Sequence, residues 1–488
     1  MRLSVASFAV LALACSSAAR RGNTVILASG ADLQSANPLL TVHPLARQVQ
    51  RYCLLVTLVR YDSTLTPVPY LAREWRWSPD RTVLTMRIFP GLRWHDGVPT
   101  TARDAAWTLR AALAAETGYP RRADLASLSE ATAPDDSTLV LRFESAPPGI
   151  PDVLTDLAIL PQHLLDTVPF ARLRQAAWNR RPVGNGPFRF VTYQPNRRWV
   201  FEANRDFPLE LGGPPRLERF VIAVVDEPTT KLAALTSGEL DFAGINPAHA
   251  DFVRRDPRLR VLDYPLLFSY ALVFNLRRPP FDQLEARRAV AAAIDPKPIV
   301  DGVLFGFGTP ATSPLPPALT GSVLPSYRLS VLPSSRPPDF PTSRPPALPT
   351  SRPPPFEMLT VGSGEAALEQ MLQAQLAAAG IRAEIRQLEL ATYLDRVQGP
   401  SHDFAAAVMG ISGDLALGHL GRLVTLAGLR PAAGNEKLLR LIQDSLPAVF
   451  LYHARGVQGI NRRVQGVTMD LRGELVTLTQ WWVKAGER

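Results

Sequence analysis

Residues 91–113, GLRWHDGVPTTARDAAWTLRAAL, carry two adjacent local signals that together predict one unit of the fold. Asp96 and Gly97 predict a tight turn, because glycine readily adopts the positive φ that many turns require. Thr101 followed by Asp104 predicts a capping box at the start of a helix. The apolar residues that follow recur at helical spacing. This stretch therefore predicts a turn followed by an amphipathic helix.

Alternating apolar and polar residues on both sides of this unit predict strands, for example over 82–88 and 138–143. The same alternation returns at 188–193 and at 268–275. Strands that alternate with short helices along the chain predict a mixed α/β fold.

Two further helices are marked by residues at their ends. Asp226 is expected to cap a helix that starts at Pro228 and ends at Gly238. Asp282 with Glu285 predicts a third helix reaching about residue 294, which the prolines at 296 and 298 would stop.

The length of 488 residues and the 46% hydrophobic content allow a large buried core and roughly three domain-sized units at about 150 residues each. The uncharged run 3–14 follows Arg2 and is typical of a signal peptide, predicted as residues 1–14. Cys15 follows at the predicted cleavage point and is a candidate lipid anchor; the alternative is plain cleavage with Cys15 as an ordinary small residue. We expect a periplasmic or other extracytoplasmic protein, tethered to a membrane through a lipidated Cys15.

The net charge of +9 comes mostly from arginine, since lysine occurs only at 231, 297, 437 and 484. The chain has no block of five like charges, so we expect no nucleic-acid partner. The seven histidines include no pair at i, i+3 or i, i+4 spacing, so we expect no metal site and no cofactor.

Residues 325–355 differ from the rest of the chain, because eleven of these thirty-one residues are proline and the octad SRPPxxPT starts at 335 and recurs at 343. Proline lacks an amide donor and favours extended backbone, which predicts polyproline II or a low-complexity surface loop. A binding segment for a proline-reading partner is the alternative.

A series of short motifs appears in a fixed order between residues 54 and 311. They are LVRYD (58–62), PYLAREW (69–75), the segment 91–104, PVGNGPF (182–188), NRD (204–206), LTSGELD (235–241), VFN (273–275) and GFGTPA (306–311). With this series the chain resembles the bacterial extracellular solute-binding proteins of family 5, the oligopeptide-, dipeptide- and nickel-binding receptors of ABC transporters.

The resemblance implies a two-lobed fold like that of periplasmic binding proteins, with a hinge and a subdomain inserted in the first lobe. Lobe I would comprise 24–57, 183–270 and 468–488, and the inserted subdomain 58–182. Lobe II would comprise 271–467, including the proline-rich loop 325–355. The glycines at 184 and 186 are expected to permit a turn before the next strand.

The resemblance also implies a set of ligand-binding residues in the second lobe. Asp414 aligns with the aspartate that in peptide binders pairs with the ligand's free amino group; the alternative is that Asp414 only caps the following turn. Ile411 stands where an aromatic residue often stacks on the ligand, so that this contact would be lost. Tyr270 and Asn275 lie on the strand that enters lobe II and are candidate contacts; as alternatives, Tyr270 would be core and Asn275 a turn cap.

The function implied is that of a monomeric, non-enzymatic receptor that closes on a small peptide or peptide-like ligand and delivers it to an ABC permease. The first alternative keeps the fold and changes the cargo to a metal chelate, haem, a sugar or an opine. The second is an exported hydrolase, although the sequence contains neither a GxSxG elbow nor an HExxH helix. A membrane-tethered interaction protein that uses the proline octads is the third.

Overall fold

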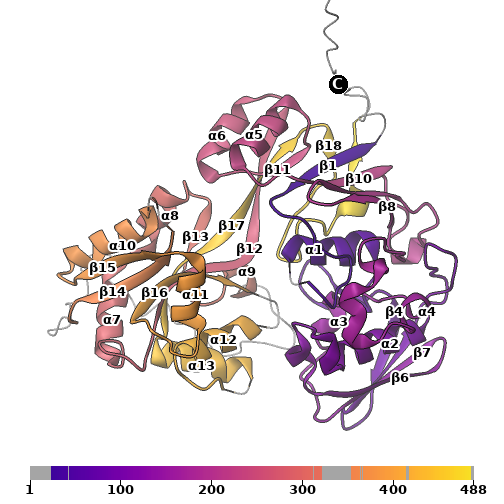
Figure 1. The fold of residues 1–488 in the computed structure, drawn as a ribbon, viewed down its shortest axis with the longest axis horizontal. Helices are drawn as coiled ribbons and strands as arrows, with labels where there is room; N and C mark the ends of the chain where they lie inside the picture. The colour runs from indigo at the N-terminus through magenta and orange to yellow at the C-terminus, as the bar shows by residue number, and fades with distance from the viewer. Residues whose placement is uncertain are drawn as a thin grey trace, which may run out of the picture.

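Two long antiparallel strands, β12 (Leu259–Phe274) and β17 (Ala448–Asn461), lie in the middle of the molecule and connect its two groups of elements (Figure 1). The structure is a computed structural model that describes residues 23–484 except 42, 312, 321–352, 363, 365, 414–416 and 433. The predicted signal peptide, Cys15, Asp414 and most of the proline-rich segment lie outside the described residues.

β12 and β17 are the centre of one eleven-stranded sheet. Its order is β15-β14-β16-β12-β17-β11-β1-β10-β9-β8, with β13 paired to β17. The remaining strands on the lobe I side are β1 (Thr24–Ser29), β8 (Phe188–Gln194), β9 (Arg198–Ala203), β10 (Arg219–Val224) and β11 (Phe242–Gly244). Those on the lobe II side are β13 (Gly308–Pro310), β14 (Phe356–Val361), β15 (Ala383–Leu388) and β16 (Ala406–Ser412). This mixed sheet, together with the two groups of elements that it joins, is the α/β two-lobed architecture expected from the sequence.

The pairing of β12 with β17 changes register where the strands cross between the lobes. Residues 259–265 of β12 pair with 455–461 of β17, whereas 269–273 pair with 448–453. The register shifts between Pro265 and Ser269 and again between Tyr270 and Ala271. An irregular hydrogen-bond ladder bends and twists a strand pair locally. The strand pair therefore passes from one lobe to the other at a point where the sheet can change direction.

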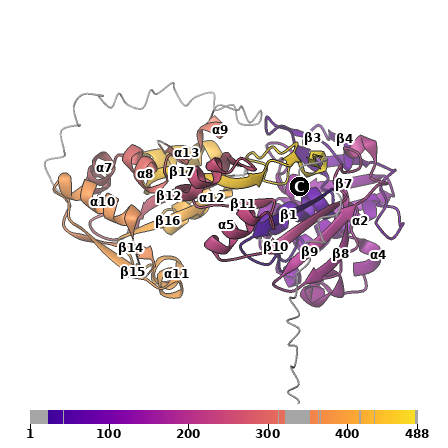
Figure 2. The ribbon, with the colours of Figure 1, turned by 90° about the horizontal axis from the view of Figure 1, so that it is seen from above.

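Lobe II has helices on both faces of its strands (Figure 2). Strands covered on both faces are apolar along their length rather than alternating, as in the buried run Ala271–Phe274. Helices α7 (Leu284–Ala293), α8 (Pro296–Val303) and α10 (Ala367–Ala378) form one core with the face that bears Leu272 and Met358. Val273 packs on the other face with α12 (Gly418–Leu426) and α13 (Asn435–Ser445), while α11 (Leu390–Gln398) packs near Leu359. The short helix α9 (Pro317–Thr320) follows β13.

A separate four-stranded antiparallel sheet, β4-β5-β7-β6, forms the centre of the region between 58 and 182. Its strands are β4 (Ala72–Trp77), β5 (Val83–Ile88), β6 (Leu128–Asp135) and β7 (Thr138–Phe143), and helix α2 (Ala102–Leu113) packs on β6 and β7. The capping box is confirmed: Thr101 Oγ1 accepts from the Arg103 amide and Asp104 Oδ2 accepts from the Thr101 amide. Gly97 has φ +93°, which confirms the predicted turn.

Lobe I and this region also contain short helices and strands. They are α1 (Pro44–Val49), the π-helical turn η2 (Gln50–Leu54), β2 (Val59–Tyr61), β3 (Pro67–Pro69), the 3₁₀ turn η4 (Arg122–Leu125), α3 (Val153–Asp156), α4 (Gln162–Leu165), α5 (Pro228–Ser237), α6 (Ala250–Arg255), β18 (Val464–Gln465) and β19 (Trp482–Val483). No helix in the described part of the chain combines the length and the apolar character needed to cross a bilayer.

The predicted caps of two helices were wrong. Helix α5 begins at Pro228 as predicted, but its cap is Glu227, whose carboxylate accepts from the amides of Thr229 and Thr230. Helix α7 is preceded by Gln283 and has no side-chain cap, so Asp282 does not play the expected role.

The prolines after α7 also do more than stop a helix. Pro296 is the first residue of α8, and the Asp295 carboxylate caps that helix by accepting from the Lys297 amide. Proline at the first helical position loses no hydrogen bond, which is why it can start a helix there.

Candidate functional site

A cavity of about 960 Å³ lies where the crossing strands meet the short elements of lobe I. Lobe I and the inserted subdomain contribute residues from 44–62 and 152–156, and the C-terminal loop contributes 470–480. Residues 264–268 of β12 and the pair 412–413 at the end of β16 also line the cavity, together with Val68, Tyr70, Arg121, Pro187, Leu211, Gly212, Pro214 and Arg216. The cavity therefore has walls from both lobes and touches β12 at the register change.

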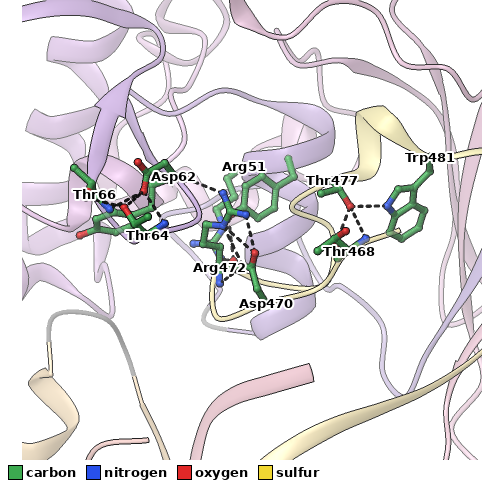
Figure 3. A network of polar contacts seen from close by, with 11 residues as sticks. Arg51, Asp62, Thr64, Thr66, Thr468, Asp470, Arg472, Thr477 and Trp481 are labelled. Carbon is green, nitrogen blue, oxygen red and sulfur yellow. Dashed lines mark hydrogen bonds and ion pairs between the residues drawn. The ribbon is translucent and has the colours of Figure 1, made fainter. Parts of the chain in front are cut away.

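The C-terminal loop is held against lobe I by a polar network (Figure 3). Arg472 pairs with Asp470 at 2.6 Å, and its backbone carbonyl accepts from Arg51 Nη2 at 2.7 Å. The two ends of the loop are joined by Thr477, whose hydroxyl accepts from the Trp481 indole and the Thr468 amide, each at 3.0 Å. The loop is thus a fixed wall of the cavity.

Where β12 passes the cavity, Tyr264 makes the principal buried polar contact. Its hydroxyl donates to Glu474 Oε1 at 2.5 Å. Burial raises the pKa of the Glu474 carboxyl, although this hydrogen bond acts in the opposite direction. The Tyr264 ring lies over Gly456 of β17, where a Cβ atom would meet the ring at 2.2 Å. Gly456 is therefore required opposite Tyr264 in the β12–β17 ladder, because a side chain there would occupy the space of the ring.

The lobe I wall contains three arginines directed at one carboxylate. Asp156, at the end of α3, accepts from Arg51 Nη1 and Arg121 Nη1 at 2.6 Å each and forms a third ion pair with Arg47. The Asp156 side chain is only 9% exposed. Burial acts to raise the pKa of Asp156, but the attraction of the arginines outweighs it and lowers the pKa to about 2. Asp156 is therefore ionised throughout the physiological pH range.

The predicted contacts Tyr270, Asn275 and Ile411 are not among the described residues that line the cavity. Tyr270 stacks on Tyr452 with ring centroids 5.0 Å apart. Asn275 is buried and donates to the carbonyls of His402 and Phe404. Ile411 is buried in the core formed with α12 and α13.

The other two predicted site residues, Asp414 and Cys15, lie outside the described residues. The described residues nearest to Asp414 on its N-terminal side, Ser412 and Gly413, line the cavity. Gly413 also donates its amide to the Leu267 carbonyl of β12 at 2.6 Å. The roles assigned to the five predicted residues remain predictions.

Sequence reasoning missed Phe268 and the three arginines. Phe268 lines the cavity, contacts the edge of Tyr270 with centroids 5.5 Å apart and covers Gly410 on the neighbouring strand. Phe268 could have been found from the sequence, because it lies two residues before Tyr270 and therefore on the same face of the strand. Arg47 and Arg51 share the i, i+4 spacing of one helical face, but nothing local connects them with Arg121 or Asp156.

Several motif residues build the frame instead of the cavity. Asp241, which ends the LTSGELD motif, is fully buried and forms a bidentate pair with Arg463 at 2.7 Å for both contacts. His95 bonds the Gly186 carbonyl at 3.0 Å, and burial lowers the pKa of His95 to about 4.

The glycines at 184 and 186 do not provide positive φ for a turn, which was the expected reason for them, since neither has positive φ. A Cβ atom on Gly184 would lie 2.1 Å from the Leu54 carbonyl oxygen. One on Gly186 would lie 2.6 Å from the Cys53 carbonyl oxygen. These glycines are required because two backbone segments approach each other closely.

Comparison with known proteins gives a consistent set of similarities. The family model described as bacterial extracellular solute-binding proteins, family 5 middle, matches residues 66–328. A protein of Brucella ovis, named as an ABC transporter peptide-binding protein, is 31% identical over 256 residues, which are 52% of this chain and 48% of the relative. The chain thus spans about half the length of this relative. Di/tripeptide-binding protein 2 of Pseudomonas aeruginosa is 26% identical over 368 residues, 69% of this chain and 66% of that protein.

Solved structures share the fold over nearly the whole chain. The oligopeptide-binding protein AppA of Bacillus subtilis, solved with a nonapeptide, superposes with a TM-score of 0.72 at 19% identity, covering 94% of this chain and 99% of AppA. NikZ of Campylobacter jejuni, solved with Ni(L-His), gives a TM-score of 0.71 at 18% identity, covering 94% and 99%.

Proposed function

Because the chain belongs to the bacterial extracellular solute-binding proteins of family 5, we propose that it is the receptor of an ABC importer and binds peptides or peptide-like solutes between its lobes. The ligand is held by reversible, non-covalent contacts and passed to a membrane permease. The proteins of this family are binding components of transporters rather than enzymes, and the proposal involves no chemical change of the cargo.

The observation that carries the proposal is the position of the cavity. Its volume of about 960 Å³ lies at the upper end of the range of about 300–1,000 Å³ common for small-molecule sites. It is lined by both lobes and by the part of β12 where the pairing with β17 changes register. A ligand in this position contacts both lobes at once, so that it favours the closed form over the open form.

Closure requires that the ligand bind the closed form better. Shifting an open-to-closed ratio from 1:99 to 99:1 takes about a 10⁴-fold preference. Contacts to Ser412 and Gly413 of lobe II are the source of that preference in this proposal, because an open receptor loses them while its contacts to lobe I persist.

We assign recognition of a free amino group to Asp414. This assignment is supported by Ser412 and Gly413, which immediately precede the segment 414–416 and line the cavity. A carboxylate paired with an ammonium group gives a charge-assisted hydrogen bond, which is roughly twice as strong as a neutral one. Tyr270 and Asn275 remain proposed ligand contacts on the strand that enters lobe II, and Ile411 stands where the stacking contact of an aromatic residue would be lost.

The proposed location is extracytoplasmic, with Cys15 as the lipid-modified residue that tethers the protein. The layout of residues 1–15 supports this placement. Mass spectrometry of the N-terminus of protein made in its natural host tests it: a diacylglycerol-modified Cys15 is expected, and an unmodified N-terminus at or after Cys15 contradicts lipidation.

The nature of the cargo is tested by native mass spectrometry of protein purified without unfolding, followed by calorimetry with a library of two- to nine-residue peptides. Co-purified peptides, and dissociation constants in the micromolar range or tighter, are the expected result. Small-angle scattering with and without the bound peptide should show compaction. If no peptide of the library binds and a metal chelate, haem, a sugar or an opine co-purifies, the proposal of a peptide cargo is replaced by that cargo. NikZ, which shares the fold, was solved with a nickel chelate.

A further inference from the structure

The described chain begins at an edge of lobe I where segments from distant parts of the sequence meet. The strands β1, β10 and β18 lie together there (Figure 1). Asn23 Oδ1 accepts from the Val483 amide of β19 at 3.0 Å, and Val483 lies opposite Val464 of β18. Arg260, near the start of β12, donates from Nη2 to the Val464 carbonyl at 3.5 Å. The start of β1, the start of β12 and the β18–β19 pair therefore share one surface.

This surface is rich in positive charge. The segments 216–219, 258–260 and 462–465 meet there and contain six arginines and a single acidic residue, Glu218. The first segment is joined to Asn23, whose carbonyl accepts from the Glu218 amide at 2.9 Å. Two of the six arginines, at positions 258 and 463, pair with Asp256 and Asp241 from outside these segments. The surface therefore keeps an excess of positive charge at neutral pH.

Two neighbouring arginines of this surface, Arg260 and Arg462, form no ion pair with a carboxylate of the described chain. Arg462 is exposed, and its Nε donates to the Leu259 carbonyl at 2.8 Å. Arg260 is half-buried, and its Nε has no hydrogen-bond partner among the described residues. Burial and the positive charge of Arg462 lower the pKa of Arg260. An anion bound beside both side chains would offset their mutual repulsion.

An exposed tryptophan lies beside these arginines. Trp481 is fully buried and stacks on Phe242 with ring centroids 4.7 Å apart, whereas the next residue, Trp482, is 36% exposed. Trp482 lies opposite Gln465 in the β18–β19 ladder, so that both side chains are on the same face. The Gln465 side chain donates to the Arg462 carbonyl at 2.6 Å. An exposed tryptophan among arginines is typical of surfaces that lie at the boundary between water and lipid.

The proposed anchor lies close to this surface along the chain. Cys15 precedes Asn23 by eight positions, and two further arginines occur between them, at 20 and 21. Eight residues span at most about 29 Å, whatever their conformation. A lipid-modified Cys15 would therefore hold Asn23, and the surface around it, beside the bilayer. Anionic lipids attract basic residues that are held near the membrane in this way.

We propose that the entry face, formed by Asn23, Arg260, Arg462, Gln465 and Trp482, lies against the anionic lipid headgroups of the membrane to which the protein is tethered. The two arginines bind lipid phosphate groups, and the Trp482 ring lies at the level of the headgroups. This inference rests on the proposed location and goes beyond it, because the folded surface as well as the lipid holds the receptor at the membrane and fixes its orientation there.

The test measures co-sedimentation of the protein with lipid vesicles. It uses the mature chain, which begins at residue 15, with Cys15→Ser, so that no covalent lipid contributes to binding. Vesicles of phosphatidylglycerol and phosphatidylcholine in equal parts are compared with vesicles of phosphatidylcholine alone. The protein should bind the anionic vesicles at low ionic strength at least about 10-fold more tightly than the neutral ones, and added salt should weaken this binding.

Variants of the entry face locate the binding surface. Replacing Arg260 and Arg462 together by glutamine should weaken binding to the anionic vesicles by about 10- to 30-fold, since each basic residue near such a surface contributes roughly fivefold. Trp482→Ala should weaken it several-fold. The matched control replaces Arg73 and Arg76 by glutamine, which removes the same charge from exposed positions of β4, away from β18 (Figure 1). The control should bind within about 2-fold of the parent chain.

Equal losses in the Arg260/Arg462 variant and in the control would mean that net charge alone drives adsorption, which overturns the proposal. Failure of the parent chain to bind anionic vesicles, or equal binding to both kinds of vesicle, also overturns it. If the double variant does not fold, Arg462→Gln changes only an exposed side chain and should weaken binding about fivefold. Vesicle binding by the unlipidated chain supports the entry face even if mass spectrometry shows that Cys15 is unmodified.

Discussion

Replacing Asp241 by asparagine should strongly destabilise the protein. Asp241 Oδ2 accepts from the Ile26 amide at 2.9 Å and from Arg463 Nη2 at 2.7 Å, while Oδ1 accepts from Arg463 Nε at 2.7 Å. All three partners are donors, so the amide group of an asparagine must turn its NH₂ toward another donor. The Arg463 side chain, 12% exposed, would also lose its counter-charge. Breaking one side of a buried pair costs about 3–5 kcal/mol.

Urea unfolding followed by tryptophan fluorescence measures this loss. Asp136→Asn is the matched control, because it removes one carboxylate from an ion pair whose side chains are 60% and 70% exposed. Exposed pairs contribute about 0.2–1 kcal/mol. If Asp241→Asn lowers the free energy of unfolding no more than Asp136→Asn does, the argument that burial makes this pair critical is refuted.

Three other outcomes follow from the described contacts. Gly410→Ala places a Cβ atom 2.5 Å from the Phe268 ring, so the ring must shift at the edge of the cavity. Calorimetry should show weaker ligand binding with little loss of thermal stability. An unchanged affinity would contradict a role for Phe268 in ligand binding. Burial lowers the pKa of His453 to about 4, and Ser269 Oγ lies 2.8 Å from His453 Nδ1. The unfolded state takes up a proton first as the pH falls, at a pKa near 6.5, so His453 should lower the free energy of unfolding by about 1.4 kcal/mol per pH unit between pH 6.5 and 4. Urea unfolding of His453→Gln should show a smaller loss of stability over that interval. An equal loss in the variant would contradict this role of His453. Thr101→Ala removes the α2 cap and should cost about 1 kcal/mol of unfolding free energy, whereas no change in the urea midpoint would mean that the cap is dispensable.

Sequence reasoning succeeded where the deciding interactions are local. Thr101 and Asp104 bond within one helical turn, so the capping box was visible in the letters alone. The choice of Glu227 over Asp226 as a cap depends on the backbone geometry at the helix entrance, which composition does not reveal. The ordered motifs predicted the fold because most of them are frame residues, as the buried pair of Asp241 with Arg463 illustrates.

The candidate site was less accessible to sequence reasoning because its walls come from distant parts of the chain. Arg47 and Asp156 are 109 positions apart, and Arg51 contacts Arg472 at a separation of 421. No local pattern signals such contacts. Phe268 was passed over in favour of Tyr270 because the two share a strand face, and only the position of the cavity distinguishes the residue at its edge from the one behind it.

The chain leaves lobe I along β12 and returns along β17, and at the far end of this pair Val273 lies opposite Ala448. The polypeptide between these two positions therefore begins and ends at adjacent points on neighbouring strands. Because its two ends are neighbours, exchange of this segment for a corresponding one leaves the path of the remaining backbone unchanged. Such an exchange would replace Ser412 and Gly413 in the cavity lining and leave the lining residues at 44–62 and 470–480 as they are.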